Sequence, residues 1–179
     1  FNEDKSILTE RVLTISSDIV TQVEGMMVTA DSTVLVLGSS TNDTMPILLT
    51  RMDTFGDVIW NRSYDILVNQ VEDLRGLHVT ELVNGNIVIF GGLQSSGIDS
   101  RKGYVLTTDA NGNALKTEMI SPNNTNREMY TSGIVTVEDT LVVMAIQLSD
   151  GIDVIPALMK YNLDSVISYE SLLDTTLVS

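Results

Sequence analysis

Residues 33–39 read Thr33-Val-Leu-Val-Leu-Gly-Ser39, and this apolar segment has two close relatives further along the chain. They read Asn86-Ile-Val-Ile-Phe-Gly-Gly92 and Thr140-Leu-Val-Val-Met-Ala-Ile146, at offsets of 53 and 54 residues. Recurrence at a fixed period of this length is typical of repeat architectures. A short, almost continuous apolar run predicts a strand that is buried on both faces.

Turn signals and glycines recur around these three segments. A pair of turn-forming residues precedes each one and predicts a two-residue hairpin. The pairs are Asp31-Ser32, Asn84-Gly85 and Glu138-Asp139. Upstream of each pair lies a further apolar segment, with a glycine near the point where backbones would crowd: Gly25, Gly76 and Gly133.

A second motif follows each apolar segment, in which a strand ends in Asp or Asn and a short turn leads to another strand. The three copies read Ile47-Leu-Leu-Thr-Arg-Met-Asp53-Thr-Phe-Gly56-Asp-Val-Ile-Trp60, Tyr104-Val-Leu-Thr-Thr-Asp109-Ala-Asn-Gly112-Asn-Ala-Leu115 and Ala157-Leu-Met-Lys-Tyr-Asn162-Leu-Asp-Ser-Val-Ile167. Each unit therefore predicts four short antiparallel strands. In the first unit they span 19–30, 33–40, 46–53 and 57–64, and the more polar fourth strand is expected at an exposed edge.

The sequence thus predicts an all-β fold, because no segment shows a sustained helical period. It predicts three tandem four-stranded antiparallel repeats of about 54 residues that form one domain. The expected boundaries are 16–68, 69–122 and 123–179. Residues 1–15 hold a spare strand at 7–13, equivalent to the outer strand of a unit that is otherwise missing.

The four-stranded unit resembles a β-propeller blade. Residues 48–60, followed 24 residues later by Asn84-Gly-Asn-Ile-Val-Ile-Phe-Gly-Gly92, are similar to the blade pattern of secreted and cell-surface propeller-like repeat proteins of bacteria and archaea. The resemblance implies the fold and says little about chemistry. The chain departs from the pattern at several points: only the first unit has the Trp, the third lacks both glycines, and the Lys position holds Arg51, Thr107 and Lys160 in turn.

Three blades are fewer than the four to eight of a typical closed propeller. The chain is then a fragment of a longer propeller, half of a six-bladed homodimer, or an open stack whose sheet edges pair with neighbours. In the last case the spare strand at 7–13 is a candidate donor strand, because unpaired edges are templates for assembly.

Composition narrows the possible functions. The 179 residues include 24 acidic and 10 basic ones, a formal net charge of -14, which argues against nucleic acid and anionic membranes as partners. The chain has no cysteine and one histidine, His78, which disfavours thiolate chemistry, zinc sites and His-based triads. No apolar run approaches the ~18 residues of a membrane span. The same features, with three sequons, favour an extracellular or cell-surface protein; the sequons begin at Asn42, Asn61 and Asn123.

Two groups of polar residues are candidate sites. Asp109, Asn111 and Asn113 offer oxygen ligands at alternate positions and are weak calcium candidates, but the site lacks a distal bidentate Glu and the repeat places a turn there. Carboxylates on or just before the first strands of the units are a weaker case for a glycoside hydrolase or lyase: Glu24, Asp73 and Glu128. Trp60 and Tyr64 are expected to cover a sheet edge.

Taken together, these features predict a non-enzymatic extracellular structural or interaction module that needs no cofactor. Its expected partners are copies of itself, joined through exposed strand edges, or other surface proteins and glycans. Loops at 41–46, 93–102 and 121–127 are expected at one rim. The alternative is a ligand- or glycan-binding propeller, either a fragment or half of a closed six-bladed dimer.

Overall fold

The computed structural model is all-β, as the sequence predicts, with no helix in the part of the chain that it describes. The described residues are 22–39, 47–65, 71–95, 102–120, 128–136, 141–149 and 154–163. They form the strands β1 (Gln22–Val28), β2 (Val34–Ser39), β3 (Ile47–Met52), β4 (Val58–Tyr64), β5 (Val71–Glu81), β6 (Ile87–Ser95), β7 (Lys102–Thr108), β8 (Ala114–Ile120), β9 (Glu128–Thr136), β10 (Leu141–Ser149) and β11 (Val154–Asn162).

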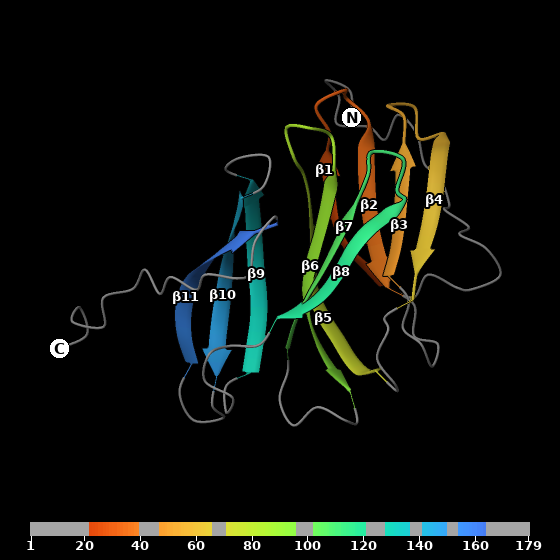
Figure 1. Ribbon diagram of the computed structural model, residues 1–179. Helices are drawn as coiled ribbons and strands as arrows, with labels where there is room; N and C mark the ends of the chain where they lie inside the picture. Colours follow the sequence, from red (N-terminus) through yellow and green to blue (C-terminus); the bar gives the residue numbers. More distant parts are fainter. Residues whose placement is uncertain are drawn as a thin grey trace, which may run out of the picture.

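The strands form three antiparallel sheets (Figure 1). Sheet A has the order β1-β2-β3-β4, and sheet B has the order β5-β6-β7-β8. Sheet C has the order β11-β10-β9 in its described part. The four strands predicted for the first unit are confirmed. The spare strand at 7–13, the fourth strand of the third unit, and the loops at 41–46 and 121–127 lie outside the described residues, and the predicted loop at 93–102 is described only where its ends belong to β6 and β7.

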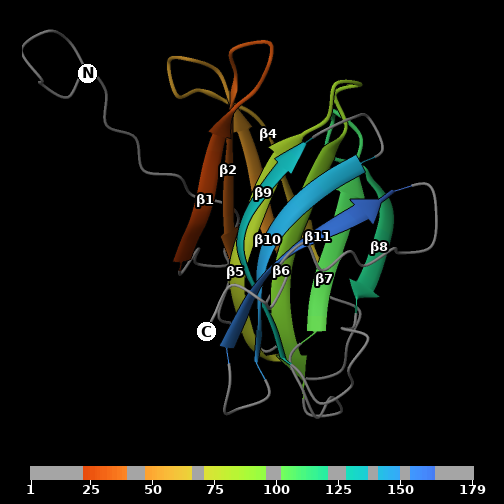
Figure 2. The ribbon, with the colours of Figure 1, turned by 90° about the vertical axis from the view of Figure 1, so that its left-hand side faces the viewer.

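Sheet B lies between the other two sheets. Strand β5 contacts β1 and β2 of sheet A on one side, and β9 of sheet C contacts β5, β6 and β7. Figure 2 shows the sheets stacked in this order, with β9 and β10 in front of sheet B. The first strands of the three sheets, β1, β5 and β9, therefore follow one another through the stack.

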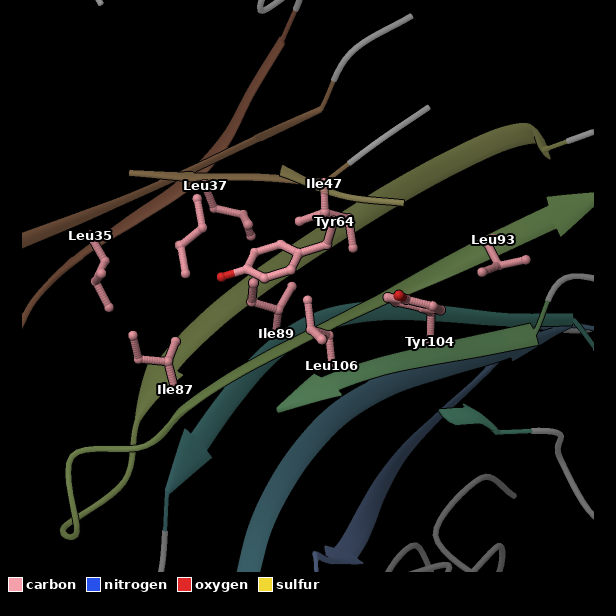
Figure 3. Packing of buried hydrophobic residues seen from close by; sticks show 10 residues of the cluster. Leu35, Leu37, Ile47, Tyr64, Ile87, Ile89, Leu93, Tyr104 and Leu106 are labelled. Carbon is pink, nitrogen blue, oxygen red and sulfur yellow. The ribbon is translucent and has the colours of Figure 1, made fainter. Parts of the chain in front are cut away.

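Inner strands are buried and outer strands are exposed, as the hydrophobic pattern predicts. Strands β2 and β3 are largely buried, whereas most of β4 and β8 is exposed. The main core fills the space between sheets A and B, and Figure 3 shows side chains of the two sheets facing one another there. Its buried members are Leu35, Leu37, Ile47, Leu49, Tyr64, Ile87, Ile89, Leu93, Tyr104 and Leu106.

The tight hairpins correct the predicted turn length. In all four described tight turns, three residues separate the last residues joined by backbone hydrogen bonds, as between Thr29 and Thr33. A type I turn followed by a left-handed residue gives this geometry. The predicted residue pairs cover only two of the three loop residues, and the left-handed residue is the third residue of each loop. The left-handed residues are Ser32, Gly56, Gly85 and Gly112, with φ of 68°, 84°, 82° and 76°.

The glycines of the first strands lie at irregularities of the sheets. The register of β1 shifts between Val23 and Gly25, and that of β5 shifts between Arg75 and His78, a gap that contains Gly76. The pairing of β9 with β10 shifts next to Gly133. Glycine is typical of β-bulges, which bend and twist a strand. The predicted crowding points are thus bulges in β1, β5 and β9.

The strand register also shows which residues occupy equivalent positions in the three sheets. The pairs next to the first hairpin are Val28–Val34 in sheet A and Glu81–Ile87 in sheet B. The described pair at the corresponding place in sheet C is Thr136–Val142. Val142, rather than Leu141, therefore corresponds to Val34, and the sequence alignment of the third copy was displaced by one residue along β10.

Candidate functional site

A buried arginine joins sheets A and B at the end of the stack where the tight turns lie. The side chain of Arg51, near the end of β3, is only 9% exposed. Its Nε donates to Thr33 Oγ1 at 2.7 Å, and its Nη1 donates to the backbone oxygen of Ala110, in the β7–β8 turn, at 3.0 Å. One guanidinium thus holds the first hairpin of its own sheet and the second hairpin of the next sheet.

Two carboxylates complete this cluster. Arg51 Nη2 lies 2.8 Å from Asp31 Oδ2 and 3.7 Å from Glu81 Oε1. Glu81 ends β5, its side chain is 9% exposed, and its Oε2 accepts a hydrogen bond from the Ala30 nitrogen at 2.7 Å. We call these residues the turn-end cluster: Asp31, Thr33, Arg51, Glu81 and the backbone of Ala30 and Ala110.

The Asp31 carboxylate is fixed by its own hairpin. Its Oδ1 accepts hydrogen bonds from the Thr29 hydroxyl at 2.6 Å and from the Thr33 hydroxyl at 2.9 Å. Because hydrogen bonds to the charged form favour that form, these hydroxyls and then Arg51 hold the pKa of Asp31 well below its usual range. Asp31 is therefore a poor proton donor or acceptor near neutral pH, and its negative charge stabilises the turn by accepting these hydrogen bonds.

A second contact joins β4 of sheet A to the β7–β8 turn of sheet B. The hydroxyl of Tyr64 donates to the Gly112 oxygen at 2.7 Å in a buried setting. Trp60 packs against the core, and the guanidinium carbon of Arg62 lies 5.7 Å from the centre of its ring. Trp60 and Tyr64 lie on the outer strand as expected, but they pack between two sheets and do more than cover an edge.

Burial of Tyr64 gives a test in alkaline solution. Loss of hydration on burial raises the pKa of Tyr64 from its ordinary value of 10.0 to about 12. Between these two values the unfolded chain loses this proton and the folded chain keeps it, so stability falls as the pH rises through that window. We expect Tyr64→Phe to cost about 1 kcal/mol at pH 7. Urea unfolding at pH 8 and pH 11 should show a smaller loss of stability in the variant than in the parent; equal losses would contradict this assignment.

The predicted calcium ligands form a turn. Asp109 Oδ1 accepts hydrogen bonds from the backbone nitrogens of Asn111 at 2.9 Å and Asn113 at 2.8 Å, and Asp109 Oδ2 accepts one from Asn113 Nδ2 at 2.8 Å. These bonds, led by the one from the Asn113 side chain, hold the pKa of Asp109 below its ordinary value. Turn chemistry explains the pattern of the three residues. Among the described residues, no group of three or more His, Asp or Glu side chains is placed to hold a metal ion.

The other predicted residues are dispersed through the fold. Glu24 Oε1 accepts a hydrogen bond from Ser39 Oγ at 3.0 Å, within sheet A. Asp73 and Glu128 lie on β5 and β9, so all three candidate carboxylates are on first strands, as predicted. Of the sequon residues, Asn61 is exposed on β4, while Asn42 and Asn123 lie outside the described residues.

Comparisons with known proteins do not assign a family. Neither a scan against protein-family models nor a search of curated proteins found a match. In the described part of the chain, no helix is long and apolar enough to cross a membrane.

Sequence reasoning missed the turn-end cluster, although one signal pointed to it. Arg51 is the only charged residue in the Ile47–Met52 strand, where every other residue except Thr50 is apolar, and it holds the Lys position of the blade pattern. A charge in a buried strand is costly unless it is paired. Its position therefore indicated that a partner for the guanidinium lies close by.

Proposed function

We propose that this chain is a non-enzymatic extracellular structural or interaction module, built from propeller-like four-stranded repeats, that associates with copies of itself through its exposed strands. The observation that carries the proposal is the use of charged groups in the turn-end cluster. The charged side chains of the cluster contact the two hairpins and one another: Arg51, Asp31 and Glu81. These charged groups join sheet A to sheet B, and their described contacts are with the protein itself.

The acidic composition fits this role. A net charge of -14 keeps a β-rich chain soluble and makes association selective, because like charges oppose random contacts. The outer strands β4 and β8 carry polar and charged residues, such as Arg62 and Lys116, among their exposed positions. Each also contains a register shift close to its hairpin, where Ile59 in β4 and Leu115 in β8 are left out of the pairing. Such features limit uncontrolled edge pairing.

Deletion of residues 1–14 tests the role of the predicted spare strand. If that strand pairs with another copy, the shortened chain should fold but lose ordered assembly in electron micrographs. Circular dichroism provides the control for folding. Assembly that continues unchanged without these residues would refute pairing through the spare strand.

A ligand- or glycan-binding propeller remains the second function that the sequence predicts. The native mass distinguishes this alternative from the structural module, because a binding module works as a discrete monomer or dimer. Binding of oligosaccharides by such a discrete species, detected on a glycan array, would favour this alternative over a structural role.

A further inference from the structure

The two tight turns of sheet B carry nearly the same tetrapeptide. The β5–β6 turn reads Val83-Asn-Gly-Asn86, and the β7–β8 turn reads Ala110-Asn-Gly-Asn113. In an Asn–Gly pair the glycine nitrogen can attack the preceding side-chain amide, because glycine has no Cβ to hinder the approach. The chain therefore holds one reactive sequence in two different settings.

The side-chain amide of Asn84 is polarised by its own turn. Asn84 is exposed, and its Oδ1 accepts a hydrogen bond from the Asn86 nitrogen at 2.9 Å. Attack of the Gly85 nitrogen on Asn84 Cγ places negative charge on this oxygen. A hydrogen-bond donor that already points at an oxygen that gains charge stabilises the intermediate. The Asn86 N–H group therefore favours attack at Asn84.

The equivalent donor has another acceptor in the β7–β8 turn. The Asn113 nitrogen donates to Asp109 Oδ1 at 2.8 Å, and the Asn111 nitrogen donates to the same oxygen at 2.9 Å. Leu82 occupies the position of Asp109 in the β5–β6 turn, and a leucine side chain accepts no hydrogen bond. Asp109 thus directs the Asn113 donor away from the Asn111 amide.

The two glycines also differ in their freedom to move. Gly112 is buried, and its oxygen accepts a hydrogen bond from the Tyr64 hydroxyl at 2.7 Å. A Cβ on Gly112 would lie against Arg62 and Trp60, whereas Gly85 is only half-buried. In both turns the glycine nitrogen donates to the backbone oxygen of the residue before the loop, so the cost of freeing this nitrogen is similar. The remaining contacts therefore restrain Gly112 more than Gly85.

We propose that Asn84 is a site of spontaneous deamidation and that the β7–β8 turn protects Asn111 from the same reaction. The Gly85 nitrogen loses its proton to hydroxide and bonds to Asn84 Cγ. The bond from Cγ to Nδ2 then breaks, and the amino group takes a proton from water and leaves as ammonia. Water opens the resulting cyclic imide at either carbonyl, which leaves aspartate or isoaspartate at position 84. The reaction consumes water, releases ammonia and regenerates the hydroxide.

Isoaspartate at this position lengthens the β5–β6 turn. Its side-chain carbon becomes part of the main chain, so the loop between Leu82 and Asn86 gains a backbone atom. Backbone hydrogen bonds from the Leu82 nitrogen to the Asn86 oxygen at 2.8 Å and from the Gly85 nitrogen to the Leu82 oxygen at 2.9 Å close the present loop. Glu81, which contacts Arg51, is the residue next to Leu82. Deamidation thus adds a negative charge and a longer loop beside the turn-end cluster.

Peptide mass spectrometry of the full chain, incubated at mildly alkaline pH, measures the rate at each asparagine. Each conversion replaces an amino group by a hydroxyl and changes the peptide mass by that difference. In the folded chain Asn84 should convert about fivefold faster than Asn111, because one hydrogen bond changes an equilibrium by about this factor. In concentrated urea the two rates should be nearly equal, because the tetrapeptides nearly match. Equal rates in the folded chain, or a faster rate at Asn111, would overturn the proposal.

A pair of variants tests the protecting role of Asp109. Asp109→Ala frees the Asn113 nitrogen, and we expect it to raise the Asn111 rate about fivefold while the Asn84 rate stays unchanged. Asp53→Ala is the matched control, because Asp53 accepts the same two backbone hydrogen bonds in the β3–β4 turn. This control should change neither rate. An unchanged Asn111 rate in folded Asp109→Ala protein, checked by circular dichroism, would contradict protection by Asp109. If that variant does not fold, the rates in the parent chain decide the proposal.

Discussion

Arg51→Ala is expected to lower the free energy of unfolding by about 3–5 kcal/mol, because removing one partner of a buried ion pair leaves the other charge uncompensated. Glu81 would stay 9% exposed without its cation, and the Ala110 oxygen would lose its donor. For a chain of this size, the melting temperature should fall by roughly 10 °C. Urea unfolding and calorimetry measure both quantities.

Arg62→Ala provides a matched control. Arg62 is exposed, donates to the oxygen of the adjacent Asn61, and lies over the Trp60 ring. Contacts of this kind at exposed sites contribute about 0.5–1 kcal/mol, so the control should lose far less stability than the Arg51 variant. In a double-mutant cycle, Glu81→Gln should reduce the cost of Arg51→Ala. If the two arginine variants lost equal stability, the turn-end cluster would not be what joins the sheets.

Gly112→Ala is expected to cost about 2–4 kcal/mol, because two penalties add at this residue. With φ of 76° the backbone is left-handed, which disfavours any side chain. A Cβ at this position would also lie 2.8 Å from Arg62 Cγ and 3.0 Å from Trp60 Cζ3. These atoms belong to sheet A, so the substitution pushes the two sheets apart at the turn.

Gly85→Ala separates the two penalties. Gly85 has nearly the same φ, 82°, but among the described residues a Cβ there would meet only the Ala110 side chain within 4 Å, at an ordinary 3.7 Å. This control should cost only the backbone penalty of about 1–2 kcal/mol. The difference between the variants in chemical denaturation reports the packing of the β7–β8 turn on β4. Equal costs at Gly112 and Gly85 would mean that this packing contributes nothing.

Local features of the chain were predictable, and contacts between sheets were not. The strands of sheets A and B follow from apolar periodicity and from turn residues, which depend on near neighbours. The predicted turn length was wrong. Ser32 and Gly85 were taken as the second residues of two-residue turns, whereas each is the left-handed last residue of a three-residue loop. A turn pair in a sequence does not show how many residues the loop holds.

The turn-end cluster depends on how the sheets stack. Arg51 meets Ala110 across 59 residues of sequence, and Ala30 meets Glu81 across 51. No local pattern encodes such separations. The position of Arg51 in a buried strand was a signal that a partner exists, but its identity required the packing of sheet A on sheet B. The same packing places Tyr64 in the core, although its strand is an exposed edge.

The native mass of the unmodified chain as a function of concentration tests the central claim most directly. Light scattering should be combined with electron micrographs of the same samples. The proposed structural role predicts a mass that rises with concentration in an open-ended series, seen as filaments. A mass that stays at one chain over the whole concentration range would contradict self-association, and with it the assignment of this chain as a structural subunit.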